Sequence, residues 1–186
     1  MKKILITAFE PFDGRETNAS SEVLKSLPEQ IGEYTVHKML LPVVFGKAAG
    51  QISAEPFDYI FLLGEAGRNL VTPETTARNI RDARIPDNEG NQPIGETIIS
   101  GGMETYHTAI PVKKIVEQIT GEGYAIEVSE DAGTFVCNDT FYLVGTGTGR
   151  PVEFIHVPSA GAAGAANTVC RFIELAVSTG KVLSEV

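Results

Sequence analysis

Two cysteines and one histidine in apolar surroundings are the side chains of this sequence best suited to nucleophilic chemistry. Cys137 lies in AGTFVCNDTFY, residues 132–142, after a predicted strand and a polar corner, and is expected near a strand-to-helix junction. A thiol in the first turn of a helix is stabilised as the thiolate, the reactive form of cysteine. The alternative is a small, inert core residue, the usual role of a cysteine in an apolar setting. Cys170 fits that alternative, because it lies on the apolar stripe of the last predicted helix.

His156 is the histidine with an informative setting. It lies in FIHVP, residues 154–158, an apolar strand that ends at a proline. A buried imidazole needs a hydrogen-bond partner, and a satisfied core histidine is the simpler interpretation. A thiol on a neighbouring element makes a Cys/His catalytic pair the alternative. His37 and His107 have no motif around them and are expected to be exposed or structural.

Charged side chains crowd the polar segment 70–103, which contains Glu74 and Arg84 and is hard to assign to helix or strand. A solvated loop would account for these residues without a functional role, because Pro, Asp and Asn are favoured in turns by their backbone conformation alone. A long ordered loop in a compact domain is more often functional, which favours a role in a site. Before it, GEAGR at residues 64–68 lacks the spacing of a phosphate loop but follows a predicted strand, where α/β sheets bind ligands.

The elements that must position these residues alternate along the chain. Consecutive apolar residues predict strands buried on both faces, as in a parallel or mixed sheet covered by helices. The strands are expected at 4–9, 34–41, 59–63, 124–128 and 154–157. Apolar spacing and capping residues predict helices after Asn18, after Pro111 with Gly121 as its C′ residue, and over 163–178 before Gly180. The pattern indicates an α/β sandwich.

Composition limits the functional class. The 186 residues carry 15 Lys and Arg against 24 Asp and Glu, a net charge of −9, which argues against nucleic acid as a partner. Length and a hydrophobic content of 42% predict one compact domain over 1–186, without a segment long enough to span a membrane. Two cysteines are too few for a disulfide framework and lack zinc spacing, so free thiols in a reducing cytoplasm are expected.

Four blocks together resemble a known family. FEPF at 9–12, ARIPDNEG at 83–90, AGTFVCN at 132–138 and FIHVP at 154–158 resemble pyroglutamyl peptidase I, in the same order. The resemblance implies a cysteine peptidase that removes an N-terminal pyroglutamyl residue from peptides, without metal or cofactor. It also implies a three-layer α/β/α sandwich on a twisted mixed, mostly parallel sheet. The sequence does not fix the oligomeric state, and a homo-oligomer stays open.

Carried over by position, the resemblance makes Cys137 the nucleophile, His156 the general base and then acid, and Glu74 the acidic third member. Arg84 matches an arginine near the oxyanion, where the backbone N–H of Cys137 would also donate. An apolar slot would suit an uncharged lactam and would reject charged side chains by their desolvation cost. The residues matching the family's pocket lining are Phe9, Phe12, Ile85, Phe135 and Val136.

The chain also departs from the family. Glu65, counted with the substrate-binding residues, stands where the family often has glutamine, and the chain is one residue shorter between Gly64 and Glu74. The loop at 159–164 replaces a longer one. A carboxylate at position 65 could repel the usual substrate or hold a different one. Two alternatives follow: a related thiol amidohydrolase acting on another cyclic or blocked acyl amide, and a weakly active small-ligand binding protein of the same fold.

Overall fold

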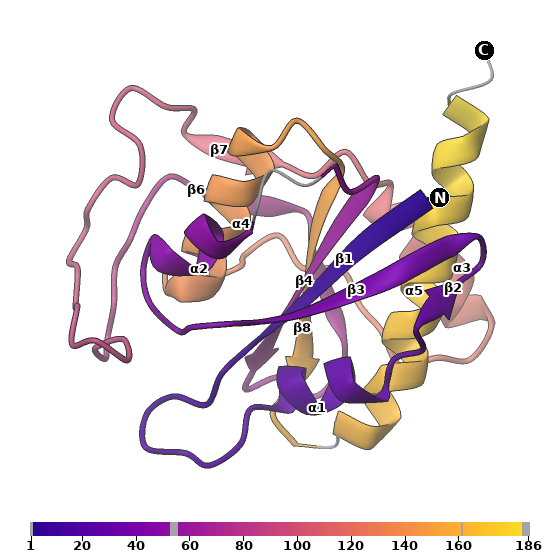
Figure 1. The fold of residues 1–186 in the computed structure, drawn as a ribbon, viewed down its shortest axis with the longest axis horizontal. Helices are drawn as coiled ribbons and strands as arrows, with labels where there is room; N and C mark the ends of the chain where they lie inside the picture. Colours follow the sequence, from indigo (N-terminus) through magenta and orange to yellow (C-terminus); the bar gives the residue numbers. More distant parts are fainter. Residues whose placement is uncertain (1, 53–55, 161, 184–186) are drawn as a thin grey trace.

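A computed structural model describes residues 2–52, 56–160 and 162–183 (Figure 1). Its centre is a six-stranded sheet in the order β2-β3-β1-β4-β8-β5. The four inner strands are mutually parallel, and the short strands at the two edges are antiparallel to their neighbours. The parallel strands are β1 (Lys2–Phe9), β3 (Tyr34–Leu41), β4 (Tyr59–Ala66) and β8 (Val152–Pro158), and the edge strands are β2 (Gln30–Ile31) and β5 (Thr72–Glu74).

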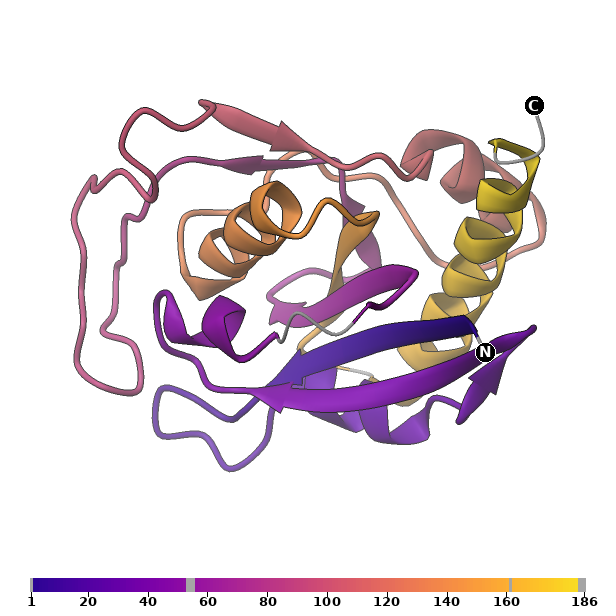
Figure 2. The ribbon, with the colours of Figure 1, turned by 45° about the horizontal axis from the view of Figure 1, so that its top comes forward.

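Helices cover both faces of this sheet (Figure 2). On one face lie α1 (Ala19–Ser26), α3 (Val112–Gly121) and α5 (Ala162–Leu183), and on the other lie α2 (Lys47–Gln51) and α4 (Val136–Gly147). Alternate residues of β1 enter the two cores: Ile4 and Ile6 pack with the first group of helices, and Leu5 and Phe9 with the second. This alternation explains the consecutive apolar residues and confirms the three-layer α/β/α sandwich.

The predicted helices form, with two corrections at their ends. The side chain of Asn18 caps α1 by accepting a hydrogen bond from Ser20 N at 3.0 Å, as expected. The helix after Pro111 ends differently, because Gly121 is still helical and Gly123 at φ 91° is the left-handed residue. There the N–H groups of Gly123 and Tyr124 bond back to the last turn, a Schellman arrangement. The last helix also continues through Gly180 to Leu183.

The strand predicted at 124–128 does not form. This segment runs beside β5 and makes only isolated parallel bridges, Val71 to Ile126 and Glu74 to Ser129. Between them, a regular ladder would need an N–H on Pro73 to reach the carbonyl of Glu127, and proline has none. The prediction was wrong because a proline on the neighbouring strand interrupts the pairing.

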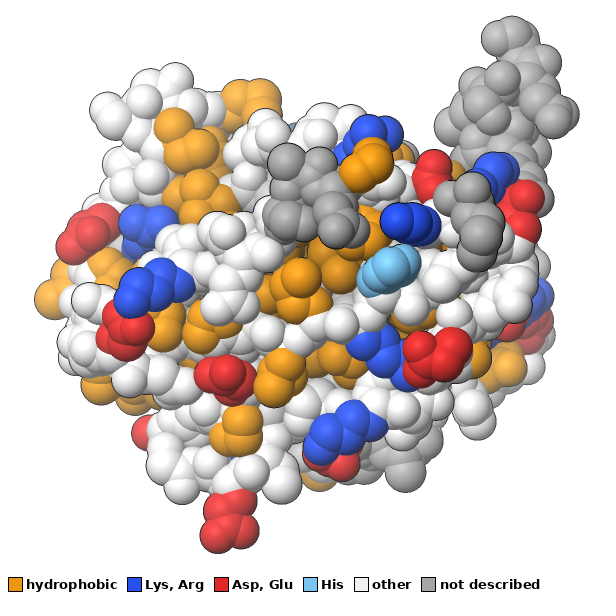
Figure 3. All heavy atoms as spheres, in the orientation of Figure 1, with side chains coloured by type: hydrophobic (Ala, Val, Ile, Leu, Met, Phe, Trp, Pro, Cys, Tyr) orange, Lys and Arg blue, Asp and Glu red, His pale blue; other side chains and the backbone are white. Residues whose placement is uncertain are grey.

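The polar segment 70–103 is partly ordered into strands. It contains β5 and β6 (Thr76–Arg78), and β6 pairs with β7 (Thr105–His107) in a separate two-stranded sheet. The irregular chain between β6 and β7 extends away from the main sheet (Figures 1 and 2). On the face shown in Figure 3, side chains of both charges are interspersed. Within the described ranges, every helix is too short or too polar to cross a membrane.

Candidate active site

A cavity of about 360 Å³ lies at the carboxyl ends of β1, β4 and β8, against the start of α4. This is where parallel α/β sheets usually bind ligands, because loops and helix N-termini converge there. The wall combines aromatic, charged and thiol side chains. It is lined by Phe9, Phe12, Asn18, Val43, Glu65, Ala66, Arg68, Arg84, Asp131, Ala132, Gly133, Phe135, Val136, Cys137 and His156.

Cys137 is the second residue of α4, which confirms its expected place at a helix N-terminus. The thiol lies directly over Gly64 near the end of β4. A Cβ at residue 64 would be 2.9 Å from the Cys137 Sγ and 2.7 Å from the Phe154 ring. Gly64 therefore permits the helix and its thiol to approach the sheet more closely than any larger residue would.

The charge state of the thiol differs from the expectation. Burial, followed by the negative charges of Glu74 and Glu65, raises the pKa of Cys137 to about 12. The positive charge of Arg68 and the backbone at the helix start act to lower the pKa, but desolvation of the partly buried thiol and the two carboxylates outweigh them. The resting side chain is a thiol, so its chemistry needs a base within reach.

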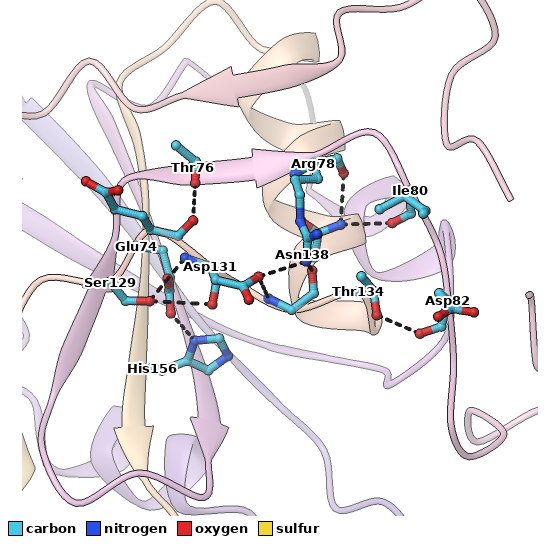
Figure 4. Close-up of polar contacts among 12 residues, drawn as sticks. Glu74, Thr76, Arg78, Ile80, Asp82, Ser129, Asp131, Thr134, Asn138 and His156 are labelled. Carbon is cyan, nitrogen blue, oxygen red and sulfur yellow. Dashed lines mark hydrogen bonds and ion pairs between the residues drawn. The ribbon is translucent and has the colours of Figure 1, made fainter. Parts of the chain in front are cut away.

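His156 and Glu74 form the buried pair that can supply this base. The His156 Nδ1 lies 2.7 Å from the Glu74 Oε1, and the two side chains point toward one another from β8 and β5 (Figure 4). Glu74 is 0% exposed, so it is not the solvated loop residue that its polar neighbours suggest. His156 is paired in register with Gly64, which brings the imidazole and the Cys137 thiol to the same point on β4.

The two residues after Cys137 fix the start of α4. The Asn138 side chain accepts a hydrogen bond from Arg78 N and donates to the carbonyls of Arg78 and Ile80 (Figure 4). The buried Asp139 carboxylate accepts from Arg81 Nε at 2.6 Å and from a backbone N–H of the chain before α2. Both side chains tie the helix to the 76–82 segment and hold the thiol in place.

Arg84 lines the cavity from the loop at 83–90, and no described residue forms a hydrogen bond or ion pair with its guanidinium. The loop is organised by Asp87, which accepts from the N–H groups of Phe45, Glu89 and Asn91. Burial acts to raise the pKa of Asp87, but these bonds and the Asn91 side chain outweigh it, and the pKa is lowered. Arg84 is thus presented to the cavity by an ordered loop.

The apolar wall contains four of the five pocket residues expected from the resemblance. Phe12 packs against Phe135 with ring centroids 6.1 Å apart, and Phe9 and Val136 complete the wall. Ile85 is half-buried and is not among the lining residues. Its side chain is one position beyond Arg84, and the turn that aims the arginine into the cavity leaves its neighbour outside.

Comparison with known proteins agrees with this geometry. The model of the family described as pyroglutamyl peptidase matches residues 2–170. The chain belongs to the pyroglutamyl peptidase family. It is 45% identical over 166 residues to a pyrrolidone-carboxylate peptidase of Staphylococcus carnosus, covering 84% of this chain and 78% of that protein.

Solved structures of the family share the fold. Pyroglutamyl peptidase I of Bacillus amyloliquefaciens superposes with a TM-score of 0.88 at 36% identity, covering 96% of this chain and 98% of that one. Pyrrolidone carboxyl peptidase of Thermus thermophilus gives 0.86 at 30% identity, over 92% and 98%. In the described part of this family member, no three His, Cys, Asp or Glu side chains gather in an arrangement that could hold a metal ion.

The structure shows how the carboxylate of Glu65 is accommodated at the cavity wall. The Glu65 side chain is 4% exposed and forms a two-pronged ion pair with Arg15. It also accepts a hydrogen bond of 2.7 Å from Ala19 N, the first N–H of α1. Arg15 in turn lies 6.0 Å from the centre of the Phe12 ring. The carboxylate is therefore neutralised at the cavity wall and anchors the loop that carries Phe12.

Sequence reasoning missed two residues of this site, Gly64 and Arg68. Both lie in the GEAGR segment, whose position after a strand was the available signal. The role of Gly64 depends on the approach of α4, and that of Arg68 on its ion pair with Glu74, at 2.9 Å between Nη1 and Oε1. The first contact joins residues that are distant in the sequence, and the second depends on how the chain turns between Arg68 and Glu74, so neither can be read from local spacing.

Proposed function

We propose that this chain is a cysteine peptidase that removes an N-terminal pyroglutamyl residue from peptides. The observation that carries the proposal is the meeting of Cys137 with the His156–Glu74 pair over Gly64, inside a cavity with an aromatic wall. A nucleophile, a base and a group that orients the base are the parts that acyl transfer requires. Membership of the pyroglutamyl peptidase family supports the substrate.

The first half of the reaction forms an acyl-enzyme. His156 Nδ1 donates to Glu74, which leaves Nε2 to take the proton from the Cys137 Sγ. The thiolate attacks the pyroglutamyl carbonyl carbon, and the oxyanion accepts hydrogen bonds from Arg84 and from the Cys137 N–H, a first-turn donor without a helical partner. The C–N bond then breaks, and the imidazolium protonates the departing amine.

The second half releases the product. His156 takes a proton from water, the hydroxide attacks the thioester carbon, and the C–S bond breaks. The thiolate regains its proton from His156, and free pyroglutamate leaves. Glu74 stabilises the imidazolium in both halves without itself changing protonation.

Selection of the lactam follows from the polarity of the cavity. Phe9, Phe12, Phe135 and Val136 offer apolar contact to a flat, uncharged ring. A free glutamate at the peptide N-terminus would bring a carboxylate and an ammonium into the same space, and desolvating each charge without a partner would cost about 5 kcal/mol. The pairing of Glu65 with Arg15 removes the repulsion that motivated another acyl-amide substrate.

We also propose that residues 1–186 act as one catalytic domain in the cytoplasm. One sheet connects both cores, and the cavity draws on residues from position 9 to position 156. Both cysteines are free thiols, which supports a reducing compartment.

A pyroglutamyl chromogenic amide tests the function directly. We expect turnover by the unmodified protein, inhibition by iodoacetamide and loss of turnover in Cys137→Ser. Cys170→Ser is the matched control, because Cys170 lies on α5 outside the cavity, and should retain activity. An active Cys137→Ser protein with an inactive Cys170→Ser protein would overturn the assignment, and binding of pyroglutamate without turnover would favour a binding protein.

A further inference from the structure

Arg68 is the charged residue of the cavity that the mechanism above does not use. Its Nη1 lies 2.9 Å from the Glu74 Oε1, the same oxygen that His156 Nδ1 approaches at 2.7 Å. Nη1 also donates to the Thr72 hydroxyl at 2.8 Å, and Nη2 to the carbonyl of Asp131 at 2.8 Å. The guanidinium thus joins β5, the 129–133 corner and the catalytic carboxylate.

We propose that Arg68 is a positioning residue for this reaction. It fixes Glu74 against His156 and supplies a permanent positive charge beside the Cys137 thiol. The inference rests on the proposed function of this site and adds a fourth member to it. Arg68 acts through Glu74 and through its charge, and forms no bond to the substrate in this scheme.

The hydrogen bonds explain the positioning. The Glu74 Oε2 is buried and has no hydrogen-bond partner among the described residues, so both partners of the carboxylate act on Oε1. Without Arg68, the carboxylate could turn to offer either oxygen to the imidazole. A guanidinium with three fixed acceptors holds one orientation, because its donors lie in a rigid plane.

The charge explains the effect on the nucleophile. Buried groups of like charge, Glu74 and Glu65, disfavour the thiolate of Cys137, while the positive charge of Arg68 acts to lower the pKa of that thiol. Of the other charged groups around the site, Glu65 is paired with Arg15 and the Asp131 carboxylate with Arg78, whereas Arg84 faces the cavity. Glu153 of β8 is buried near Glu74, and burial raises its pKa well above the usual value.

The first test needs no substrate. In a Cys170→Ser background, Cys137 is the single thiol, and its alkylation by iodoacetamide at a series of pH values reports formation of the thiolate. We expect Arg68→Gln to be alkylated about tenfold more slowly at a given pH, the result of a rise of about one unit in the thiol pKa. Alkylation at the unmodified rate would overturn the proposal, whatever the substrate of the protein.

The second test uses turnover of the pyroglutamyl amide. In Arg68→Gln the imidazolium faces a carboxylate without its second cation, so the acidic limb of the kcat/KM profile should move up by about one pH unit. A residue with only a structural role would lower kcat without moving this limb. If the unmodified protein shows no turnover, the proposed function fails, while the alkylation result still decides the role of Arg68.

Two variants complete the design. Arg68→Lys keeps the charge but not the planar fork, so its alkylation should stay within about threefold of the unmodified rate while kcat falls about tenfold. Arg171→Gln is the control, because Arg171 pairs with Glu122 and Glu174 outside the cavity, so the pH profiles of alkylation and of kcat/KM should stay in place. Should Arg68→Gln fail to fold, slow alkylation of Arg68→Lys would still overturn the charge role, as would a similar slowing in Arg171→Gln.

Discussion

At the scale of single residues, the site depends on how closely Cys137, His156 and Gly64 approach one another. Burial raises the pKa of the thiol and so favours its protonated form, which means that a nearby base is needed to form the thiolate. The close approach is possible because residue 64 has no side chain.

Gly64→Ala should abolish most activity without unfolding the protein. The new methyl group would meet the Cys137 Sγ at 2.9 Å and the Phe154 ring at 2.7 Å, so the thiol must move away from His156. We expect kcat to fall by about 100-fold, measured on the pyroglutamyl amide. Gly67→Ala is the control, because a Cβ there meets nothing within 4 Å. Equal activity of the two variants would contradict this account.

Arg15→Ala should weaken substrate binding through Glu65. The variant leaves the carboxylate on the cavity wall with the Ala19 N–H as its remaining partner, so a neutral lactam meets an uncompensated charge. We expect KM to rise about tenfold, equivalent to ~1.4 kcal/mol, with kcat little changed. In the double variant Arg15→Ala/Glu65→Gln, steady-state kinetics should show a KM close to that of the unmodified protein. If KM stays high, the effect of Arg15 does not act through Glu65.

At the scale of secondary structure, β8 carries both His156 and an unusual carboxylate, Glu153. Glu153 is fully buried three residues before His156, and both of its carboxylate oxygens lack a hydrogen-bond partner among the described residues. On the same face of the strand, Ile155 and Val157 belong to the core beneath α1, α3 and α5. Burial therefore raises the pKa of Glu153 well above its ordinary 4.5.

This carboxyl group makes stability depend on pH. Glu153 stays protonated in the folded chain over a range in which the unfolded chain is ionised, so the free energy of unfolding falls as pH rises from about 4.5 toward the folded pKa. Glu153→Gln cannot ionise and lacks this decline. Its stability relative to the unmodified protein should increase with pH, with a limiting slope of about 1.4 kcal/mol per pH unit. Urea unfolding at several pH values measures the difference, and a constant difference would contradict it.

At the scale of the whole molecule, one sheet joins two cores. Residues of β1, β4 and β8 alternate between the core containing Phe172 of α5 and the core containing Phe141 of α4. The two cores share the same strands, so disruption of the sheet would disrupt both, and we expect them to unfold together.

We therefore expect a single unfolding transition that activity, near-UV and far-UV circular dichroism report at the same denaturant concentration. Phe172→Ala and Phe141→Ala remove fully buried rings from opposite layers. Each should lower the free energy of unfolding by about 3–5 kcal/mol and shift all three signals together. Separate transitions for the two variants would show that the layers are independent.

Much of the fold could be predicted from local pattern. Four of the five expected strands and all three expected helices form, because consecutive apolar residues and capping side chains act over a few neighbouring positions. The strand at 124–128 failed because its pairing depends on Pro73, about fifty residues earlier. The C′ residue of α3 is Gly123 instead of Gly121, and only the backbone conformation decides between these two nearby glycines.

For the site, the sequence by itself determined the blocks that resemble the family, and with them Cys137, His156, Glu74 and Arg84 as candidates. How those groups can act depends on the folded chain. The pKa of Cys137 depends on burial, the neutralisation of Glu65 depends on Arg15, and the orientation of Glu74 depends on Arg68. Local spacing reports backbone preferences, whereas desolvation and ion pairing depend on distances in space that the folded chain sets.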